Sequence, residues 1–361
     1  MGGDGTTFAR ARTVCTPEGA QVNGNATFEH HDVALLAVTA IEATVPVPSS
    51  SFDEQLRPTL RRLRLPRGLL GRVAGVHERR WWDAGTTFDD AAIAVGAKAL
   101  AEAGIDGDAV GLLVNTSVTR THLEPSVASR IHDGLGLPSR AQNFDLTNAC
   151  LGFVNGMTLA AQLIDAGQVD YAVVVDGEDP QPTQEATIRR LSEPTSTRAD
   201  FLREFATLTL GAGAAAAVLG RASAHPGAHR LLGGVSRAAT QHHDLCVGGV
   251  DGMSTDPKGL LDGGLELVVD AWNEAAPQRG WADVDRFVTH QVSTVHTQSL
   301  VQSLGLDPVK VPTTFPRWGN VGPASLPMTL VAEQGSLSAG DRVLCMGVGS
   351  GLNTAMTEIV W

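Results

Sequence analysis

The stretch FDLTNACLGFVNGMTLAAQLIDAG, residues 144–167, combines a short strand pattern, a cysteine and an apolar helical pattern. Its first six residues are typical of a strand, and from residue 151 apolar side chains recur at helical spacing until Gly167. Cys150 lies at the junction, so we expect its thiol at a helix N-terminus, over the end of a strand. There the positive end of the helix dipole would stabilise a thiolate and lower the pKa. A buried structural cysteine is the alternative that this position leaves open.

Strand and helix patterns alternate on both sides of this stretch. The segments with such patterns are strands at 32–45, 110–118 and 170–178, and helices at 52–64, 88–103 and 125–135. We expect the first helix to break near Pro58 and the second to end at Gly104. Residues 208–220 are glycine-rich and are interpreted as a pair of strands. This alternation is typical of a layered α/β fold with a mostly parallel sheet.

A weak internal repeat indicates a duplicated architecture. AGQVDYAVVVDGED (166–179) resembles AGDRVLCMGVGSG (339–351), and VGLLVNTS (110–117) resembles DRFVTHQVS (285–293) in position and character. Chance similarity between α/β segments is the alternative. The repeat predicts two similar halves that pack together, with a site at their junction.

The predicted domain organisation follows from this repeat. We expect a flexible N-terminal extension over 1–24, a first half over 25–227 and a second half over 228–361. Residues 180–206 are polar and charged and break the alternation, so they are interpreted as an insertion or lid in the first half.

Composition excludes several classes of function. The formal net charge of −12 disfavours a nucleic-acid-binding protein, which is usually basic. Cys15, Cys150, Cys246 and Cys345 are widely spaced, which disfavours a zinc site or a disulfide framework and fits a reducing cytoplasm. Neither an apolar run of membrane-spanning length nor a signal-peptide pattern occurs. We therefore expect a soluble cytoplasmic protein, not an integral membrane protein.

Two polar residues downstream are candidates for a site. His290 follows the strand pattern FVT, where a histidine would act as a donor or a base, although a satisfied core histidine is common. Asn320 lies in the turn GNVGPAS (319–325), where its amide would either cap the loop or donate to a thioester carbonyl.

A terminal glycine-rich turn supplies the last candidate. In GVGSGLN (347–353) the glycines allow close approach of the backbone, so the N–H of Ser350 would join that of Cys150 in an oxyanion hole. A plain turn between two strands is the alternative. The turn leads to another strand pattern, which excludes a dinucleotide-binding fingerprint because that motif opens a helix.

The order of these motifs resembles the condensing branch of the thiolase superfamily, which includes ketoacyl-ACP synthase III and hydroxymethylglutaryl-CoA synthase. It is most similar to the OleA family, the acyl-CoA condensing enzymes of bacterial long-chain olefin biosynthesis. The similarity extends from about residue 30 to the C-terminus. The matching segments are 71–83, 112–126, 145–157, 171–178, 208–216, 290–297, 319–327 and 347–361. The resemblance implies a thiolase fold, with two duplicated α/β halves in a layered αβαβα arrangement.

The resemblance also implies a role for each candidate. Cys150 would accept the first acyl group from coenzyme A as a thioester. His290 and Asn320 would bind the carbonyl of a second acyl-CoA and stabilise its enolate, and the N–H groups of Cys150 and Ser350 would hold the oxyanion. Glu124, in HLEPS, would be the base, delivered from the partner subunit of a dimer. The residues alone favour another interpretation of Glu124, an acid placed favourably before a helix.

The implied reaction is a non-decarboxylative Claisen condensation of two long-chain fatty acyl-CoAs. It gives a 2-alkyl-3-oxoalkanoate and free CoA, as the first step of long-chain olefin or related β-lactone biosynthesis. The CoA thioesters are substrates, and neither a separate cofactor nor a metal is expected. The expected partners are a second copy of the chain in a homodimer and downstream olefin-pathway enzymes. The alternatives are a decarboxylative 3-oxoacyl-ACP synthase III reaction with malonyl-ACP, or a partner subunit of a heteromeric condensing enzyme.

Two sets of residues carry weaker hypotheses about the substrate. Apolar side chains that would line a fatty-acyl tunnel, or belong to an ordinary core, are Phe153, Met157, Leu191, Phe201 and Phe205. Side chains that would face coenzyme A, or support a dimer, are Arg79, Arg80, Trp81 and Trp82.

Overall fold

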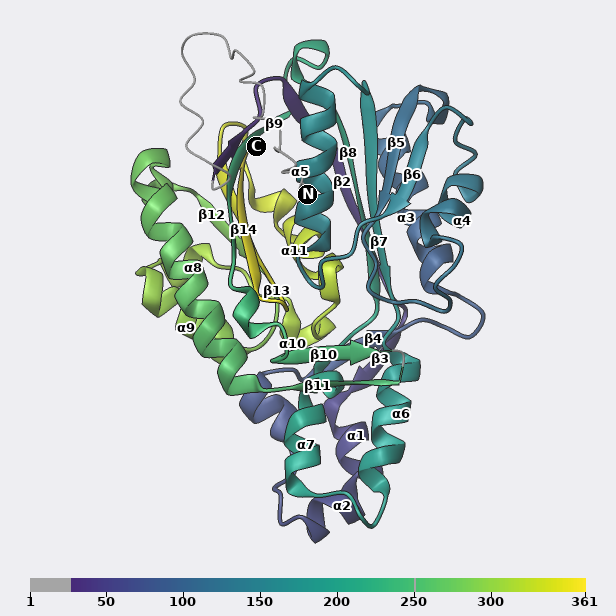
Figure 1. Ribbon diagram of the computed structural model, residues 1–361, viewed down its shortest axis with the longest axis vertical. Coiled ribbons are helices and arrows are strands. Elements are labelled where there is room, and N and C mark those ends of the chain that lie inside the picture. The colour runs from purple at the N-terminus through teal and green to yellow at the C-terminus, as the bar shows by residue number, and fades with distance from the viewer. Residues whose placement is uncertain (1–26, 250) are drawn as a thin grey trace, which may run out of the picture.

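The computed structural model describes residues 27–249 and 251–361, and their dominant feature is one mixed ten-stranded sheet (Figure 1). Its strands are β1 (Thr27–Glu29), β2 (Val33–Glu42), β5 (Val110–Asn115), β6 (Gln142–Asp145), β7 (Tyr171–Glu178), β8 (Gly213–Arg221), β9 (His229–Ala238), β12 (Arg286–Thr289), β13 (Arg342–Gly349) and β14 (Asn353–Val360). The spatial order is β12-β13-β14-β9-β2-β8-β7-β5-β6, with β1 beside β9. β5 is parallel to β6 and β7, and β12 is parallel to β13. The predicted extension over 1–24 lies outside the described residues.

The sheet repeats one topology on either side of its middle. In the first half, β2 is the first strand in the chain, and outward from it lie β8, which is the last strand of that half in the chain, and then β7 and β5. From β9 outward, the order is again the first strand, the last strand β14, then β13 and β12. β5 therefore corresponds to β12, and β7 to β13, the pairs of segments that the internal repeat matches. The division of the chain at 227 and 228 stays a prediction.

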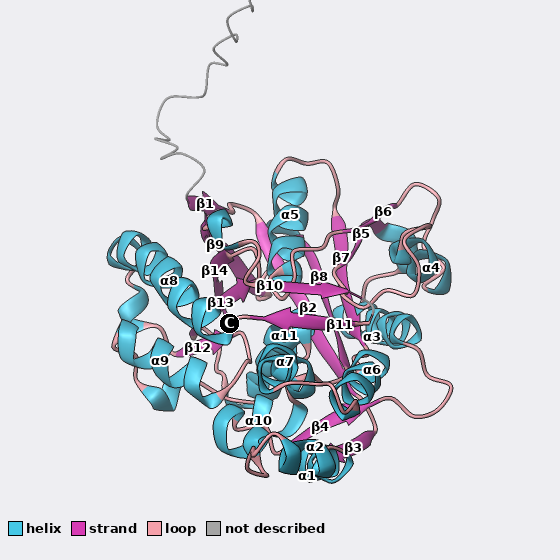
Figure 2. Ribbon diagram, turned by 60° about the horizontal axis from the view of Figure 1, so that its bottom comes forward, coloured by secondary structure: helices cyan, strands magenta, loops and turns pink. Residues whose placement is uncertain are grey.

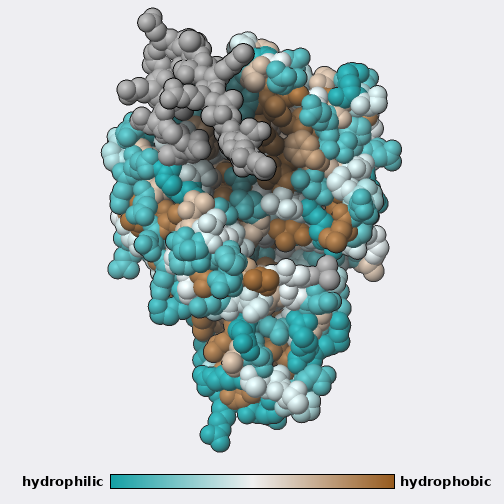
Figure 3. Space-filling view, in the orientation of Figure 1, coloured by the Kyte–Doolittle hydropathy of each residue, from teal (hydrophilic) through white to brown (hydrophobic). Residues whose placement is uncertain are grey.

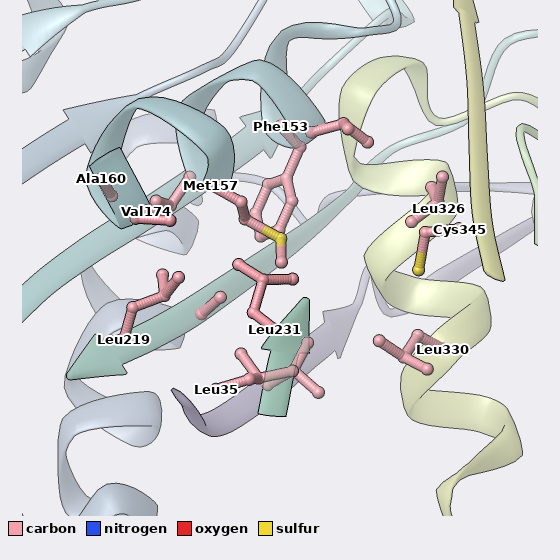
Figure 4. Packing of buried hydrophobic residues seen from close by; sticks show 14 of the residues in the cluster. Leu35, Phe153, Met157, Ala160, Val174, Leu219, Leu231, Leu326, Leu330 and Cys345 are labelled. Atoms are coloured by element: carbon pink, nitrogen blue, oxygen red, sulfur yellow. The ribbon is translucent and has the colours of Figure 1, made fainter. Parts of the chain in front are cut away.

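The two halves of the sheet form two layers, and helices form three more, one between the halves and one on each outer face. α5 (Gly152–Asp165) and α11 (Ser325–Glu333) lie between the halves and share one hydrophobic core with strands of both (Figures 1 and 4). The outer face of the first half is covered by α3 (Phe88–Ala103) and α4 (Val127–Gly134), and that of the second by α8 (Pro257–Arg279) and α9 (Thr294–Leu304). The predicted αβαβα arrangement with duplicated halves is confirmed.

Local signals account for the position of α3. Thr87 and Asp90 form a capping box, in which each side chain bonds the backbone N–H of the other residue, and acidic residues occupy the first turn. Gly104 ends the helix with a φ of 66°, a left-handed conformation that favours glycine. Caps of this kind stabilise a helix by about 1 kcal/mol. The predicted helix over 88–103 is therefore confirmed at both ends.

A smaller layer packs across one end of the sheet. Its helices are α1 (Ser49–Gln55), α2 (Arg57–Arg62), α6 (Gln181–Ser192) and α7 (Arg198–Glu204). It also contains two antiparallel strand pairs, β3 (Val45–Pro48) with β4 (Glu78–Trp81) and β10 (Cys246–Gly249) with β11 (Gly252–Thr255). The four helices gather at the bottom of Figure 1 and come forward in Figure 2. The predicted break near Pro58 is confirmed, because Pro58 lies in the first turn of α2. The segment 180–206 forms α6 and α7.

The glycine-rich segment 208–220 was predicted as two strands, and that prediction is wrong. Residues 205–209 form a 3₁₀ turn, and only β8 follows. The backbone N–H of Gly211 donates to Asn320, and that of Ala212 donates to Arg80, so this backbone is bonded outside a strand pair. A Cβ on Gly211 would lie 1.9 Å from the carbonyl oxygen of Trp318, in the short helix α10 (Phe315–Trp318). Glycine at position 211 therefore allows this backbone to pack closely against that of Trp318.

Surface and helix character agree with this layout. Hydrophilic side chains cover the outer helices, and hydrophobic ones gather in the middle of the face in Figure 3, between the halves of the sheet. Among the described residues, each helix is too short or too polar to cross a membrane.

Candidate active site

Cys150 lies in a tight turn between β6 and α5. The strand ends at Asp145, earlier than predicted, and the helix begins at Gly152. Ala149 has a φ of +46°, which is uncommon for a residue with a side chain. The N–H of Leu151 donates to Asn148 (3.0 Å) and that of Gly152 donates to Ala149 (3.1 Å). The turn thus presents the cysteine immediately before the helix, as predicted.

Burial outweighs the helix dipole at the thiol. Cys150 is partly accessible, but the surrounding protein atoms raise the pKa of its thiol to about 12, and the nearby Cys246, Glu178 and Asp176 add to that rise. The predicted lowering of the pKa is therefore wrong, because desolvation of the charged thiolate exceeds the stabilisation that a helix N-terminus provides. The resting residue is a neutral thiol, which must lose its proton as it attacks.

The turn that carries Ser350 packs against the turn that carries Cys150. A Cβ on Gly349 would lie 2.8 Å from the carbonyl oxygen of Asn148 and 3.2 Å from the amide nitrogen of Leu151. The amide of Asn353 donates to the side chain of Asn148 at 3.2 Å and joins the turns directly. Glycine is required here because any side chain would push the turns apart.

Each of the two packed turns carries a backbone N–H donor, that of Cys150 and that of Ser350. In the described part of the chain, neither the N–H of Cys150 nor that of Ser350 donates to a backbone carbonyl. Two backbone N–H groups on packed turns are the arrangement that an oxyanion hole requires.

His290 directly follows β12, and its backbone N–H donates to Met346 of β13 at 2.9 Å. Its Nδ1 is buried and has no hydrogen-bond partner among the described residues. Burial, with a smaller contribution from the nearby His296, lowers the pKa of His290 to about 4. The imidazole is therefore neutral near pH 7.

The side chain of Asn320 is held in one orientation. Its Oδ1 accepts from the N–H of Gly322 at 3.0 Å and from the hydroxyl of Ser325 at 3.3 Å. Because an N–H can bond only to an acceptor, the oxygen must face Gly322 and the NH₂ must point the other way. The amide NH₂ has no partner in the described residues, so it is free to donate to a ligand carbonyl. The structure shows the loop-capping contact, and the donor role of the amide stays a prediction.

Two buried carboxylates at the end of β7 complete the surroundings, and the sequence analysis missed both. Glu178 is 7% exposed and Asp176 is fully buried. Burial raises the pKa of Glu178 to about 7, and burial beside Glu178 raises that of Asp176. Asp176 accepts from the hydroxyl of Thr116 at 2.6 Å, and the Glu178 carboxyl carbon is 3.4 Å from a Cβ built on Gly322. The acids thus lie between the Cys150 turn and the Asn320 loop.

The raised pKa of Glu178 predicts a pH-dependent stability. Between about pH 4.5 and pH 7 the folded chain keeps a proton that the unfolded chain has lost, so the free energy of unfolding falls as pH rises through this window. The full shift corresponds to about 3 kcal/mol. Urea unfolding at pH 5 and pH 8 should therefore show a smaller loss for Glu178→Gln than for the unsubstituted chain. Equal losses would contradict the assignment.

Glu124 lies apart from these residues. It is on the loop between β5 and α4, where residues 121–125 are all exposed and Leu123 is 97% exposed. Its side chain makes no hydrogen bond or ion pair within the described residues. The structure therefore packs the Cys150 turn against the Ser350 turn and places His290 at the end of β12, beside β13, but leaves Glu124 at the surface of its own chain.

The hypothesis that Arg79 faces coenzyme A is wrong. Arg79 is fully buried, donates to the hydroxyl of Ser49 at 2.9 Å and stacks over the ring of Phe52. Its neighbours are also bonded within the chain: Arg80 pairs with Glu42 and Glu78, Trp81 donates to Gln184 and Trp82 to the carbonyl of Glu178. Because alternate residues of β4 point to opposite faces, this segment fixes the end layer to the sheet.

The proposed tunnel residues do not form one lining. Phe153 and Met157 belong to the central core, as Figure 4 shows, whereas Leu191 and Phe201 belong to the core of the end layer and Phe205 packs at its edge. Among the described residues, His, Cys, Asp and Glu side chains do not cluster in a way that would hold a metal ion.

Family models match two parts of the chain. A model described as the C-terminal part of 3-oxoacyl-[acyl-carrier-protein] synthase III matches residues 275–361, and one described as 3-oxoacyl-[acyl-carrier-protein] synthase III matches residues 144–185. These segments contain Cys150, His290, Asn320 and Ser350.

Relatives and solved structures resemble nearly the whole chain. The acyl-CoA:acyl-CoA alkyltransferase of Xanthomonas campestris is 45% identical over 91% of this chain and 99% of its own, and that of Shewanella oneidensis is 37% identical over 88% and 96%. The β-ketoacyl-[acyl-carrier-protein] synthase III 2 of Streptomyces coelicolor is 31% identical over 80% and 83%. The crystal structure of a cysteine-to-serine variant of X. campestris OleA, with bound lauric acid and lauroyl-CoA, matches with a TM-score of 0.89 and 44% identity over 92% of this chain and 100% of its own.

Proposed function

Because this chain belongs to the OleA family of acyl-CoA:acyl-CoA alkyltransferases, it is an acyltransferase, and we propose that it condenses two long-chain fatty acyl-CoAs without decarboxylation. The observation that carries the proposal is the packing of the Cys150 turn on the Ser350 turn, with a backbone N–H on each that bonds to no backbone carbonyl of the described residues. That arrangement places a nucleophile beside two donors, as acyl transfer requires.

The first step is transfer of an acyl group to Cys150. The sulfur attacks the thioester carbonyl, the bond to coenzyme A breaks, and the thiol proton leaves with coenzyme A as its free thiol. Negative charge develops on the carbonyl oxygen during this attack and needs nearby hydrogen-bond donors. The N–H groups of Cys150 and Ser350 would supply them.

The second step forms the carbon–carbon bond. A base removes the α-proton of a second acyl-CoA, and the enolate carbon attacks the acyl group on Cys150, whose sulfur leaves and regains a proton. The free NH₂ of Asn320 and the neutral imidazole of His290 would donate to the enolate oxygen. Hydrolysis of the product thioester would then release a 2-alkyl-3-oxoalkanoate and the second coenzyme A. We assign the acid to long-chain olefin or β-lactone synthesis by downstream enzymes.

Glu124 of a partner subunit is the proposed base. Its exposed loop suits delivery to a neighbouring site. Solved X. campestris OleA variants include a glutamate-to-alanine and a cysteine-to-alanine replacement, at positions separated by the same number of residues as Glu124 and Cys150. One chain that carries both residues favours a homodimer over a heteromeric enzyme.

Incubation with one acyl-CoA tests the reaction. Purified protein and myristoyl-CoA alone should give Cys150 acylated by one myristoyl group and a condensed C28 3-oxo acid, both measurable by mass spectrometry. The decarboxylative alternative predicts condensation only with malonyl-ACP, together with carbon dioxide. A chain that condenses acyl groups with malonyl-ACP and not with myristoyl-CoA would refute the proposal.

A further inference from the structure

The loop that carries Glu124, residues 118–126, combines an unattached tip with firmly attached ends. In the tip, 121–125, the one polar contact among described residues joins the hydroxyl of Thr121 to Nδ1 of His122 at 2.9 Å. Residues on both sides of the tip instead bond to side chains of the chain's interior. The loop is therefore anchored at its ends only.

The first anchor is Glu178, at the end of β7. Its carboxylate accepts from the backbone N–H groups of Val118 and Thr119, the latter at 3.1 Å, and from the hydroxyl of Thr119. The Thr119 hydroxyl oxygen accepts in turn from the N–H of Asp179 at 3.0 Å. Four hydrogen bonds thus fix the residues before the tip to the end of a buried strand.

The second anchor is Asp145, the last residue of β6. Its carboxylate accepts from the N–H groups of Val127 (3.0 Å) and Ala128 (2.9 Å), which follow the tip at the start of α4. The same carboxylate pairs with the guanidinium of Arg120, which precedes the tip, at 3.5 Å. Arg120 also donates to the carbonyl of Thr119 at 2.8 Å. Asp145 therefore connects both ends of the tip.

These contacts limit where the tip can point. A free loop would explore many conformations, and a base on such a loop would spend little time in the geometry that removes the proton, so catalysis would be slower. We propose that Arg120, Asp145 and Glu178 are positioning residues that aim Glu124 out of its own chain and into the active site of a second copy. This inference rests on the proposed function, because it takes Glu124 as the base.

Arg120→Met tests the inference, since it removes the ion pair and leaves the helix cap by Asp145 in place. With myristoyl-CoA, the variant should acylate Cys150 at the rate of the unsubstituted chain and condense about 10- to 100-fold more slowly. Arg120→Lys, which keeps the charge, should recover part of the condensation rate. Thr119→Val, which removes one hydroxyl at the first anchor, should show the same split between the steps.

Arg130→Met is the matched control. Arg130 lies on the adjacent helix α4 and pairs with Asp89 and Asp90 at 2.7 and 2.8 Å, but does not contact the loop. It should leave both steps unchanged. A defect that is merely structural would slow acylation together with condensation and would lower the melting temperature.

A mixed dimer separates the possible outcomes. If Arg120 aims the base into the other copy, co-expression of Arg120→Met with Cys150→Ala should restore condensation, because the Cys150→Ala chain supplies an intact loop to the remaining Cys150. Condensation at the full rate in Arg120→Met and Thr119→Val, or no recovery in the mixed dimer, would overturn the positioning role. Full condensation by Glu124→Gln would instead overturn the base role, and this inference with it.

Discussion

Replacing Cys150 with serine is expected to lower the rate of condensation at least about 10³-fold, because the chain loses the nucleophile that holds the first acyl group. A hydroxyl is a far weaker nucleophile than a thiol and also a poorer leaving group for the second step. Incubation of the variant with myristoyl-CoA, followed by mass measurement of protein and products, should detect neither an acylated chain nor the condensed acid.

Cys345→Ala provides the control for this substitution. Cys345 lies in β13 within the central core, and burial raises the pKa of its thiol to about 12, as it does for Cys150. If a raised pKa marked the nucleophile, the two thiols would be equivalent. Cys345→Ala should keep acylation and condensation. If the Cys150→Ser chain became acylated, or if Cys345→Ala lost acylation, Cys150 would not be the nucleophile.

The comparison of these thiols explains one failure of sequence-based prediction. The residues from 144 to 152 are sufficient to predict a turn before a helix, and the structure has that turn. The pKa depends instead on burial by surrounding protein atoms and on Cys246, Glu178 and Asp176, all of which are distant in the sequence. A local pattern contains no measure of that burial, so the predicted direction of the pKa shift was wrong.

The same distinction applies to secondary structure. α3 matches its prediction because the capping box of Thr87 and Asp90 and the terminal Gly104 are encoded in adjacent residues. The segment 208–220 does not, because Gly211 bonds to Asn320 and packs against Trp318, both distant in the sequence. Elements with local signals were predictable, and those that depend on distant backbone contacts were not.

Among the residues of the candidate site, too, those with a local sequence signal were predictable and the others were not. Cys150, His290, Asn320 and Ser350 follow strand patterns or glycine turns, which are visible in one sequence. Glu178 is the last residue of an apolar strand, so the acidic residues that end VVVDGE were an available signal of a site. Its role is not local: the carboxylate bonds to residues about sixty positions earlier. Only the folded chain connects the end of β7 to the loop that carries Glu124.

Glu124→Gln is expected to separate the two steps of the reaction. The variant should acylate Cys150 normally, since no proton of the first substrate is removed by this side chain, and should condense about 10²- to 10⁴-fold more slowly, the usual contribution of a general base. Asp133→Asn removes another exposed carboxylate, on the neighbouring helix α4, and should leave both rates unchanged. Stopped reactions with myristoyl-CoA would report the acylated chain and the product separately.

Mixed dimers determine which chain supplies the base. Homodimers of Glu124→Gln should condense only slowly and those of Cys150→Ala not at all, because each lacks one required group at every site. When the two variants are co-expressed, a dimer with one chain of each kind contains one Cys150 that faces the intact Glu124 of the other chain, so condensation should return. If Glu124 acted within its own chain, the two groups would always be on different sites and no activity would return. Recovery in the mixture therefore requires that the active site be completed across the subunit boundary, which the exposure of Glu124 on its own chain leads us to expect.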